Sequence, residues 1–237
     1  MIIVNAGIPD SGTDWAEGVF RMIWDHFRVT HCVHRPATHR EVEQFFREAD
    51  PEPNQIVTLQ HITPSLIRLA AREDVLPFFC LHDPQAVVPA QMAGCDISYE
   101  RALQRVTDAY RDLTYVCKMP GIMLLPQEHL RYQPESLVFQ MATRLGRVLS
   151  LGSVIEITRR MAQRELQSVP NAEEEADCRT LATEIEGVCL RVDEAHSMGT
   201  RDCQEKAILT PSQQALIEAR FEPLNKLLGF ETRPLPA

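Results

Sequence analysis

The chain has 237 residues, of which 44% are hydrophobic and 24% charged, so it is long enough and apolar enough to form one substantial core. Its formal net charge of −9 argues against general nucleic-acid binding, which needs a basic face. No apolar run approaches the ~20 residues that span a bilayer, and the N-terminus lacks a signal-peptide pattern, so we expect a cytoplasmic protein without a membrane segment.

The seven cysteines are odd in number and none belongs to a Cys-x-x-Cys pair, which argues against a disulfide framework or a zinc site. We therefore expect reduced, mostly buried thiols. The run His31-Cys32-Val33-His34 contains metal-ligating residue types, but in a strand its side chains alternate between two faces. Because such ligands do not converge, we expect no metal site.

The first predicted element is a buried strand over residues 1–9. A Gly/Pro/Ser turn follows it, and then an amphipathic helix from Trp15 to about His26. Backbone N–H groups at the start of a helix, together with the helix dipole, favour anionic oxygens. This junction is therefore the first candidate site.

Helices and strands alternate in the next part of the chain. Thr38 and Glu41 fit a capping box at the start of one helix, and Pro64 fits the first turn of another. The predicted elements are strands over 29–33, 56–61 and 75–81 and helices over 38–49 and 63–72. This alternation predicts βαβ units and a parallel sheet.

The second half of the chain is mainly helical. Its predicted elements are a last strand over 121–126 and helices over 99–116, 135–145, 153–168, 172–195 and 210–228. No repeat, low-complexity run or linker separates these elements. We therefore predict a single α/β domain over residues 1–237, with a parallel sheet flanked by helices and a helical C-terminal half.

Three chemically interesting segments fall at the ends of predicted strands. They are the loop over residues 7–13, His61 and His82. In open parallel sheets, ligands bind beyond the carboxyl ends of the strands. The three segments therefore predict one site at that edge of the sheet.

The spacing Gly7-x4-Gly12 is like that of a Walker A loop, but Thr13-Asp14 stands where Lys-Ser/Thr is needed. This departure argues against an NTPase. The run Pro9-x-Ser11-Gly12-Thr13-x-Trp15 instead resembles the 5′-phosphosulfate loop of sulfotransferases.

The resemblance extends over nearly the full chain. Gln60-His61 resembles the segment that supplies the catalytic histidine of cytosolic sulfotransferases, and residues 78–84 resemble the segment that holds the 3′-phosphate of the cofactor. Further similar segments are 124–130 with Pro134, 206–214 and 228–230. The resemblance implies a three-layer, P-loop-like parallel sheet.

It also implies 3′-phosphoadenosine 5′-phosphosulfate (PAPS) as the sulfuryl donor and a hydroxyl or amine as the acceptor. His61 would be the catalytic residue that deprotonates the acceptor. The residues that would bind the cofactor are Asp10, Ser11, Gly12, Thr13, Asp14, Trp15, His82 and Arg201. The identity of the acceptor (a small molecule, a glycan or a peptide) and the oligomeric state are not indicated.

Four positions depart from the family pattern. Asp10 stands where the family has Lys or Arg, and a carboxylate ~4 Å from a ligand anion is repelled by about 1–4 kcal/mol. Leu59 replaces the lysine before the histidine, and His82 and Ala90 replace an arginine and a serine of the phosphate site. The alternative function is therefore an inactive binding or scaffold protein of this fold. A third option is a pocket for a less phosphorylated or cationic ligand.

Structural roles remain open for the same residues. Ser11 or Thr13 could be the N-cap of the helix in a tight turn. Trp15 could be the first core residue of the helix rather than stack near the adenine. His61 could be a packed histidine at a strand end.

Overall fold

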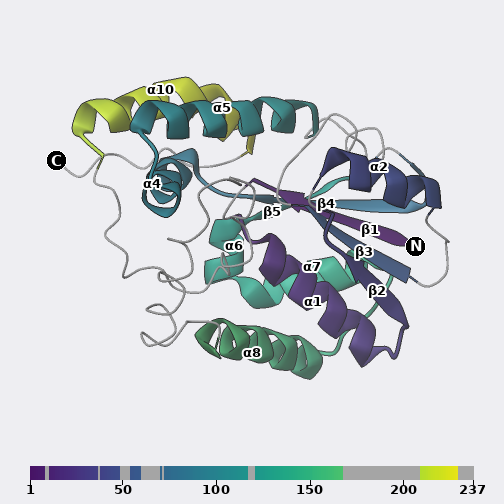
Figure 1. Cartoon of the computed structure of the whole chain (residues 1–237). Helices are drawn as coiled ribbons and strands as arrows, with labels where there is room; N and C mark the ends of the chain where they lie inside the picture. Colours follow the sequence, from purple (N-terminus) through teal and green to yellow (C-terminus); the bar gives the residue numbers. More distant parts are fainter. Residues whose placement is uncertain are drawn as a thin grey trace, which may run out of the picture.

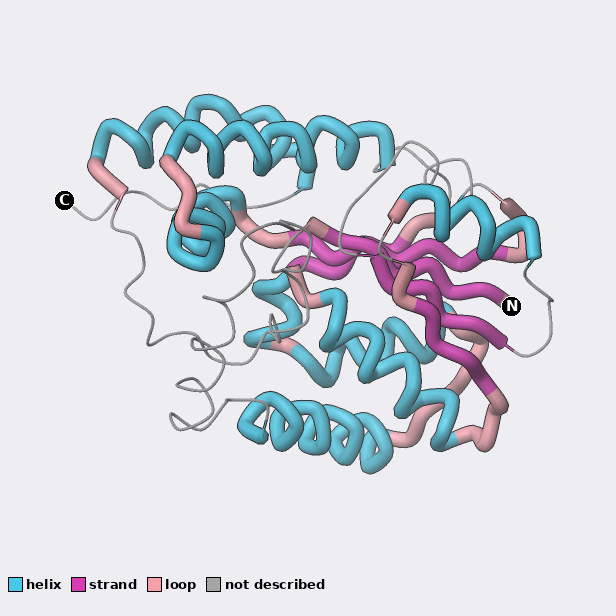
Figure 2. Tube along the Cα trace, in the orientation of Figure 1, coloured by secondary structure: helices cyan, strands magenta, loops and turns pink. Residues whose placement is uncertain are grey.

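The computed structural model describes residues 1–8, 11–36, 38–48, 54–59, 70, 72–116, 121–167 and 209–228. Its centre is a five-stranded sheet in the order β2-β3-β1-β4-β5, with helices on both faces (Figures 1 and 2). The predicted three-layer α/β architecture is therefore confirmed. None of the described helices is long and apolar enough to cross a membrane.

All neighbouring strands run parallel, as the alternation of helices and strands predicts. The strands are β1 (Ile2–Gly7), β2 (His31–His34), β3 (Asn54–Leu59), β4 (Val75–Leu81) and β5 (Met123–Pro126). Every residue of β1 is buried, because β1 is the central strand and helices cover both of its faces.

The helices form two layers around the sheet (Figure 1). One layer contains α1 (Thr13–His26), α6 (Gln127–Tyr132), α7 (Pro134–Arg144) and α8 (Leu151–Gln167). The other contains α2 (His39–Glu48), α4 (Pro84–Cys95), α5 (Tyr99–Val116) and α10 (Pro211–Leu228). Each layer has its own hydrophobic core against the sheet.

Alternation along β1 divides its side chains between these two cores. Val4 and Ala6 belong to the α5 side and Ile3 to the α1 side. On α1, Phe20 and Trp24 are fully buried against the sheet. Burial of a large apolar side chain contributes about 1.5–3 kcal/mol to stability, so this face holds α1 against the sheet.

Several local predictions are confirmed. The N–H of Glu41 donates to Thr38 Oγ1 at 3.2 Å, as half of the predicted capping box. His31 and His34 face opposite sides of the sheet, because the ring of His31 contacts Trp24 and that of His34 contacts Phe45. The predicted helix over 172–195 and nearly all of that over 63–72 lie outside the described residues.

Two of the helices in the described part of the chain, α4 and α6, were not predicted. The signal for α4 is a start motif: Asp83 is the N-cap and accepts from the N–H of Gln85 at 2.9 Å, and Pro84 is the first helical residue. Pro89 inside α4 hides the helical pattern. The other, α6, has only six residues, too few to show a helical period.

The expectation of buried thiols is correct for only part of the described chain. Cys80 is buried, Cys95 is partly buried and Cys32 is exposed, and all three are free. Cys32 lies on β2, which is an edge strand of the sheet.

Candidate functional site

The carboxyl end of β1 is a topological switch point. β1 lies between β3 and β4, so the segments that follow these three strands leave the same edge of the sheet. The chain passes from β1 to α1 on one face and from β4 to α4 on the other. Diverging connections of this kind open a crevice in which ligands bind in α/β proteins.

Gly7 allows the loop after β1 to turn back against the strand. A Cβ atom at this position would lie 2.2 Å from Ser11 Oγ, 2.8 Å from Thr13 Cγ2 and 3.0 Å from Cys80 Cβ. No larger residue fits without displacing the loop. Gly12 has a φ of 100°, in the left-handed region that favours glycine. The two glycines therefore determine the shape of this junction.

The start of α1 has no side-chain cap. Gly12 is the N-cap, so the alternative in which Ser11 or Thr13 fills that position is wrong. The Ser11 side chain points back toward Gly7, its residue is 1% exposed, and its hydroxyl has no hydrogen-bond partner within the described ranges. An uncapped helix start with a buried, unpartnered hydroxyl fits an anionic group in the loop.

Asn5 ties three strands to the first turn of α1. Its Nδ2 donates to the carbonyl of Thr13 at 2.8 Å and to Thr58 Oγ1 at 3.2 Å, and it accepts from Cys80 Sγ at 3.6 Å. Burial raises the pKa of the Cys80 thiol, and the nearby Asp14 carboxylate raises it further. Sequence reasoning missed Asn5, although a polar residue within an apolar strand is a usable signal.

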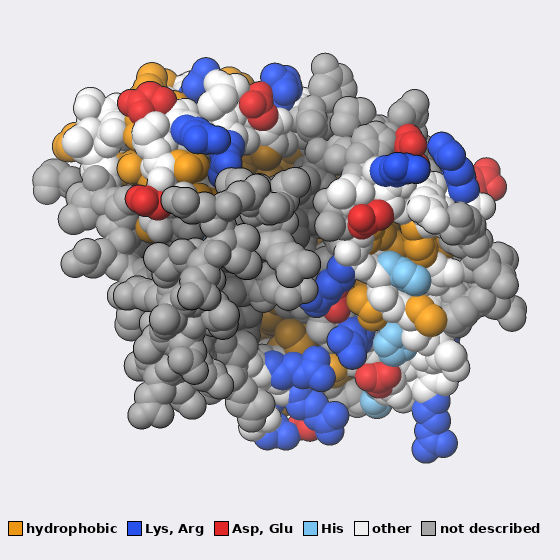
Figure 3. Space-filling model, in the orientation of Figure 1, with side chains coloured by type: hydrophobic (Ala, Val, Ile, Leu, Met, Phe, Trp, Pro, Cys, Tyr) orange, Lys and Arg blue, Asp and Glu red, His pale blue; other side chains and the backbone are white. Residues whose placement is uncertain are grey.

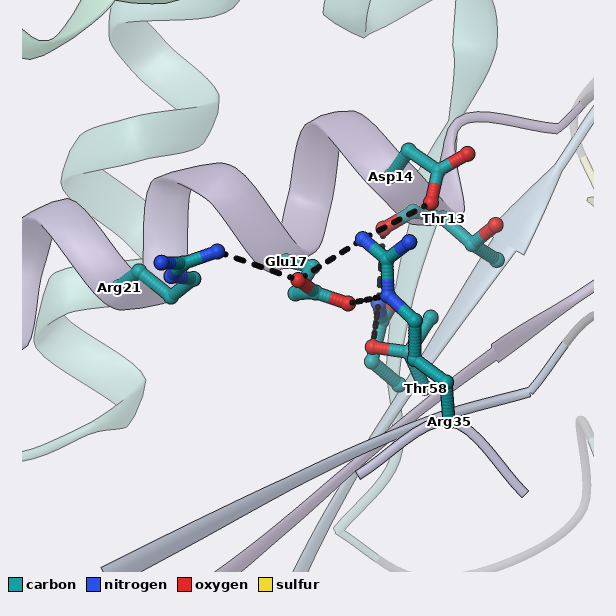
Figure 4. Close-up of polar contacts among 7 residues, drawn as sticks. Thr13, Asp14, Glu17, Arg21, Arg35 and Thr58 are labelled. Carbon is teal, nitrogen blue, oxygen red and sulfur yellow. Dashed lines mark hydrogen bonds and ion pairs between the residues drawn. The ribbon is translucent and has the colours of Figure 1, made fainter. Parts of the chain in front are cut away.

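A cluster of charges lies along the first two turns of α1 (Figure 4). Arg35, just after β2, contacts Glu17 at 2.8 and 2.9 Å and Asp14 at 3.4 Å. Arg21 lies 3.8 Å from the opposite side of Glu17. Burial raises the pKa of Asp14, the Arg35 guanidinium opposes this effect, and Glu17 adds to it. Neither Glu17 nor Arg35 was predicted as a site residue.

The ends of β4 and β5 form a second polar group. Leu81 pairs with Pro126, so the segments beginning at His82 and Gln127 leave the sheet side by side. Burial raises the pKa of Glu128, and the charge of Asp83 contributes to the same shift. The negative charges that follow β4 and β5 disfavour a phosphate next to these two strand ends.

The structure brings together half of the predicted cofactor residues. Ser11, Gly12, Thr13 and Asp14 form the β1–α1 junction, and His82 follows the neighbouring strand β4. Trp15 is 6% exposed and belongs to the α1-side core, as the core alternative expects. Asp10, His61 and Arg201 lie outside the described residues, so their predicted roles stay predictions.

Of the replaced positions, Leu59 is the last residue of β3 and Ala90 lies within α4.

Among the residues that the structure describes, no group of three or more His, Cys, Asp or Glu side chains could hold a metal ion. Over the face in Figure 3, acidic and basic side chains are interspersed. On this face the Lys and Arg side chains nevertheless gather in the lower centre, with a few acidic side chains among them.

The sequence matches no protein-family model and no curated protein. Solved structures are nevertheless similar. Mouse sulfotransferase SULT7A1, complexed with PAP, is 13% identical with a TM-score of 0.64, over 95% of this chain and 84% of that one. Retinol dehydratase is similar in two complexes, one with retinol and PAP (11% identity, TM-score 0.61) and one with androsterone and the inactive cofactor PAP (12%, 0.61). These matches cover 99% of this chain and 83% and 82% of those chains. The chain therefore has a sulfotransferase-like fold.

Proposed function

We propose that this protein binds PAPS at the β1–α1 junction and transfers its sulfuryl group to a hydroxyl or amine. The observation that carries the proposal is the uncapped start of α1 with the buried hydroxyl of Ser11, which has no hydrogen-bond partner among the described residues, in a sulfotransferase-like fold. The similar structures contain PAP, which is adenosine 3′,5′-bisphosphate, the nucleotide that remains when PAPS loses its sulfuryl group.

In this reaction the sulfur–oxygen bond to the donor phosphate breaks and a bond from sulfur to the acceptor oxygen or nitrogen forms. The acceptor loses its proton, and the products are PAP and a sulfate ester or sulfamate. His61 is the predicted base, because it follows β3, the strand next to β1. The junction would supply backbone N–H donors to the donor's phosphate oxygens.

A calorimetric titration with PAP tests the proposal, with adenosine as the control ligand that lacks both phosphates. We expect saturable binding in the micromolar range for PAP and none for adenosine. No heat of binding at millimolar PAP would refute the proposal. Asp10→Lys should tighten PAP binding, because it replaces a repulsive charge with an attractive one.

An inactive binding protein of the same fold is the second candidate. The carboxylates of Asp14 and Glu17 at the helix start, and of Asp83 and Glu128 after β4 and β5, favour this candidate because they oppose the charge that sulfuryl transfer concentrates at the reacting group, even if the nucleotide binds. Mass spectrometry of acceptor panels incubated with PAPS separates the two. Transfer that His61→Ala abolishes supports the enzyme, whereas PAP binding without transfer to any acceptor supports the binding protein.

A further inference from the structure

Arg35 brings a positive charge to the start of α1 from a distant part of the sequence. β2 pairs with β3 so that His34 is level with Val57, and Arg35 therefore follows at the level of Thr58. Figure 4 shows its side chain extending from the sheet toward α1, with Asp14 and Glu17 pointing toward the guanidinium. The charge thus lies within the first two turns of the helix.

Glu17 orients this guanidinium. Its side chain is 2% exposed, whereas that of Arg35 is 59% exposed, so the carboxylate is the fixed partner. The contacts to Glu17 use Nε and Nη2 of Arg35, in the bidentate geometry typical of arginine–carboxylate pairs. In the described part of the chain Nη1 has no partner. The Nε/Nη2 edge of the guanidinium is therefore bound to Glu17, and Nη1 remains available to a ligand.

The junction itself points to a ligand independently of Arg35. Among the described residues the buried Ser11 hydroxyl has no hydrogen-bond partner, and it lies against Gly7 at the end of β1, where a Cβ would come within 2.2 Å of it. One turn of an α-helix rises 5.4 Å, so the first-turn N–H groups and the side chain of Asp14 share a small volume. Arg35 contacts Asp14 at 3.4 Å. An anion in the loop would therefore lie close to the guanidinium.

We propose that Arg35 is the cation that binds the anionic group in this loop, with Glu17 as the residue that positions it and Asp14 as a competing internal anion. This inference rests on the proposed function. The two carboxylates are balanced by Arg35 and Arg21. An arriving phosphate or phosphosulfate oxygen takes the place of Asp14 at the guanidinium, while the contacts to Glu17 persist.

Calorimetric titrations with PAP and with inorganic pyrophosphate test this role. We expect Arg35→Gln to weaken binding of either probe by about 10- to 100-fold, the range for loss of one or two charged hydrogen bonds. Arg35→Lys should lose less, because it keeps the charge but not the bidentate geometry. Asp14→Asn should tighten binding by about fivefold, because it removes one repulsive charge.

The matched control is Arg72→Gln. Arg72 makes the same kind of bidentate pair, with Asp74 at 2.9 and 2.6 Å, but it precedes β4 and so lies at the opposite edge of the sheet. We expect no change in affinity for this variant. If Arg35→Gln does not fold, Arg35→Lys and the double variant Glu17→Gln/Arg35→Gln, which leaves no buried carboxylate unpaired, serve in its place.

The outcomes separate this inference from the proposed function. If wild type binds PAP and the Arg35 variants bind it equally well, Arg35 has only a structural role and the inference is wrong, while the proposed function stands. If pyrophosphate binds in an Arg35-dependent way but PAP does not, the inference holds and the proposed function fails. If wild type binds neither probe, both are wrong.

Discussion

Replacing Arg35 with glutamine should reduce stability more than replacing Glu17 with glutamine, although both changes break the same ion pair. The reason is the exposure of the partner that remains. Glu17 has 2% of its side chain exposed, and among the described residues Arg21, at 3.8 Å, is the cation that would remain near its carboxylate. The Arg35 side chain is 59% exposed and can be hydrated when Glu17 is neutral.

The expected magnitudes follow from this difference. Removal of one partner of a fully buried pair costs about 3–5 kcal/mol, and because Arg35 is 59% exposed and Arg21 partly compensates we expect about 2 kcal/mol for Arg35→Gln. For Glu17→Gln we expect about 1 kcal/mol, near the upper value for a pair whose remaining partner is exposed. The double variant should be more stable than Arg35→Gln alone, because it removes the buried charge.

Urea denaturation at pH 7, followed by the fluorescence of the buried Trp15 and Trp24, measures these differences. The m-value should stay constant, so that midpoint shifts report stability. Arg72→Gln is again the control and should change stability by less than about 1 kcal/mol, because both partners of that pair are exposed. Equal losses for Glu17→Gln and Arg35→Gln would refute the reasoning, because they would mean that Glu17 is not buried.

Two other changes test the packing and the titration of the strand ends. Gly7→Ala should destabilise the protein by about 1–3 kcal/mol in the same denaturation assay, because the new Cβ lies 2.2 Å from Ser11 Oγ, whereas Gly152→Ala, where the nearest atom is 3.8 Å away, should be neutral or stabilising. Burial raises the pKa of Glu128, so the stability that its protonated form provides is present below pH ~4.3, the value of an unperturbed Glu, and is lost as the pH rises through the raised pKa. Wild type should therefore lose stability relative to Glu128→Gln as the pH is raised from 4 to 8, and a constant difference between them would contradict this. Hydrogen bonds from arginines 160 and 159 lower the pKa of Glu156, so relative to Glu156→Gln wild type should lose stability as the pH falls instead.

The local elements could be predicted because their signals are contained in short segments. The apolar run before Gly7 predicts β1, and the apolar period after Gly12 predicts α1, as the structure confirms. The bounds of α5 (Tyr99–Val116) agree with the prediction from its helical period. α4 was not predicted because Pro89 interrupts its helical pattern, although Asp83 and Pro84 form a start signal.

The sequence by itself therefore determined the strand–loop–helix unit, the parallel sheet and the edge of the sheet where a ligand site should lie, because periodicity, glycines and helix starts act over a few residues. Only the tertiary structure decided which charged side chain lies at the start of α1. Glu17 and Arg35 are 18 positions apart and meet because β2 pairs with β3 and α1 packs over the sheet. Strand order and helix packing are set by burial of the whole core, and that information is not contained in any single segment.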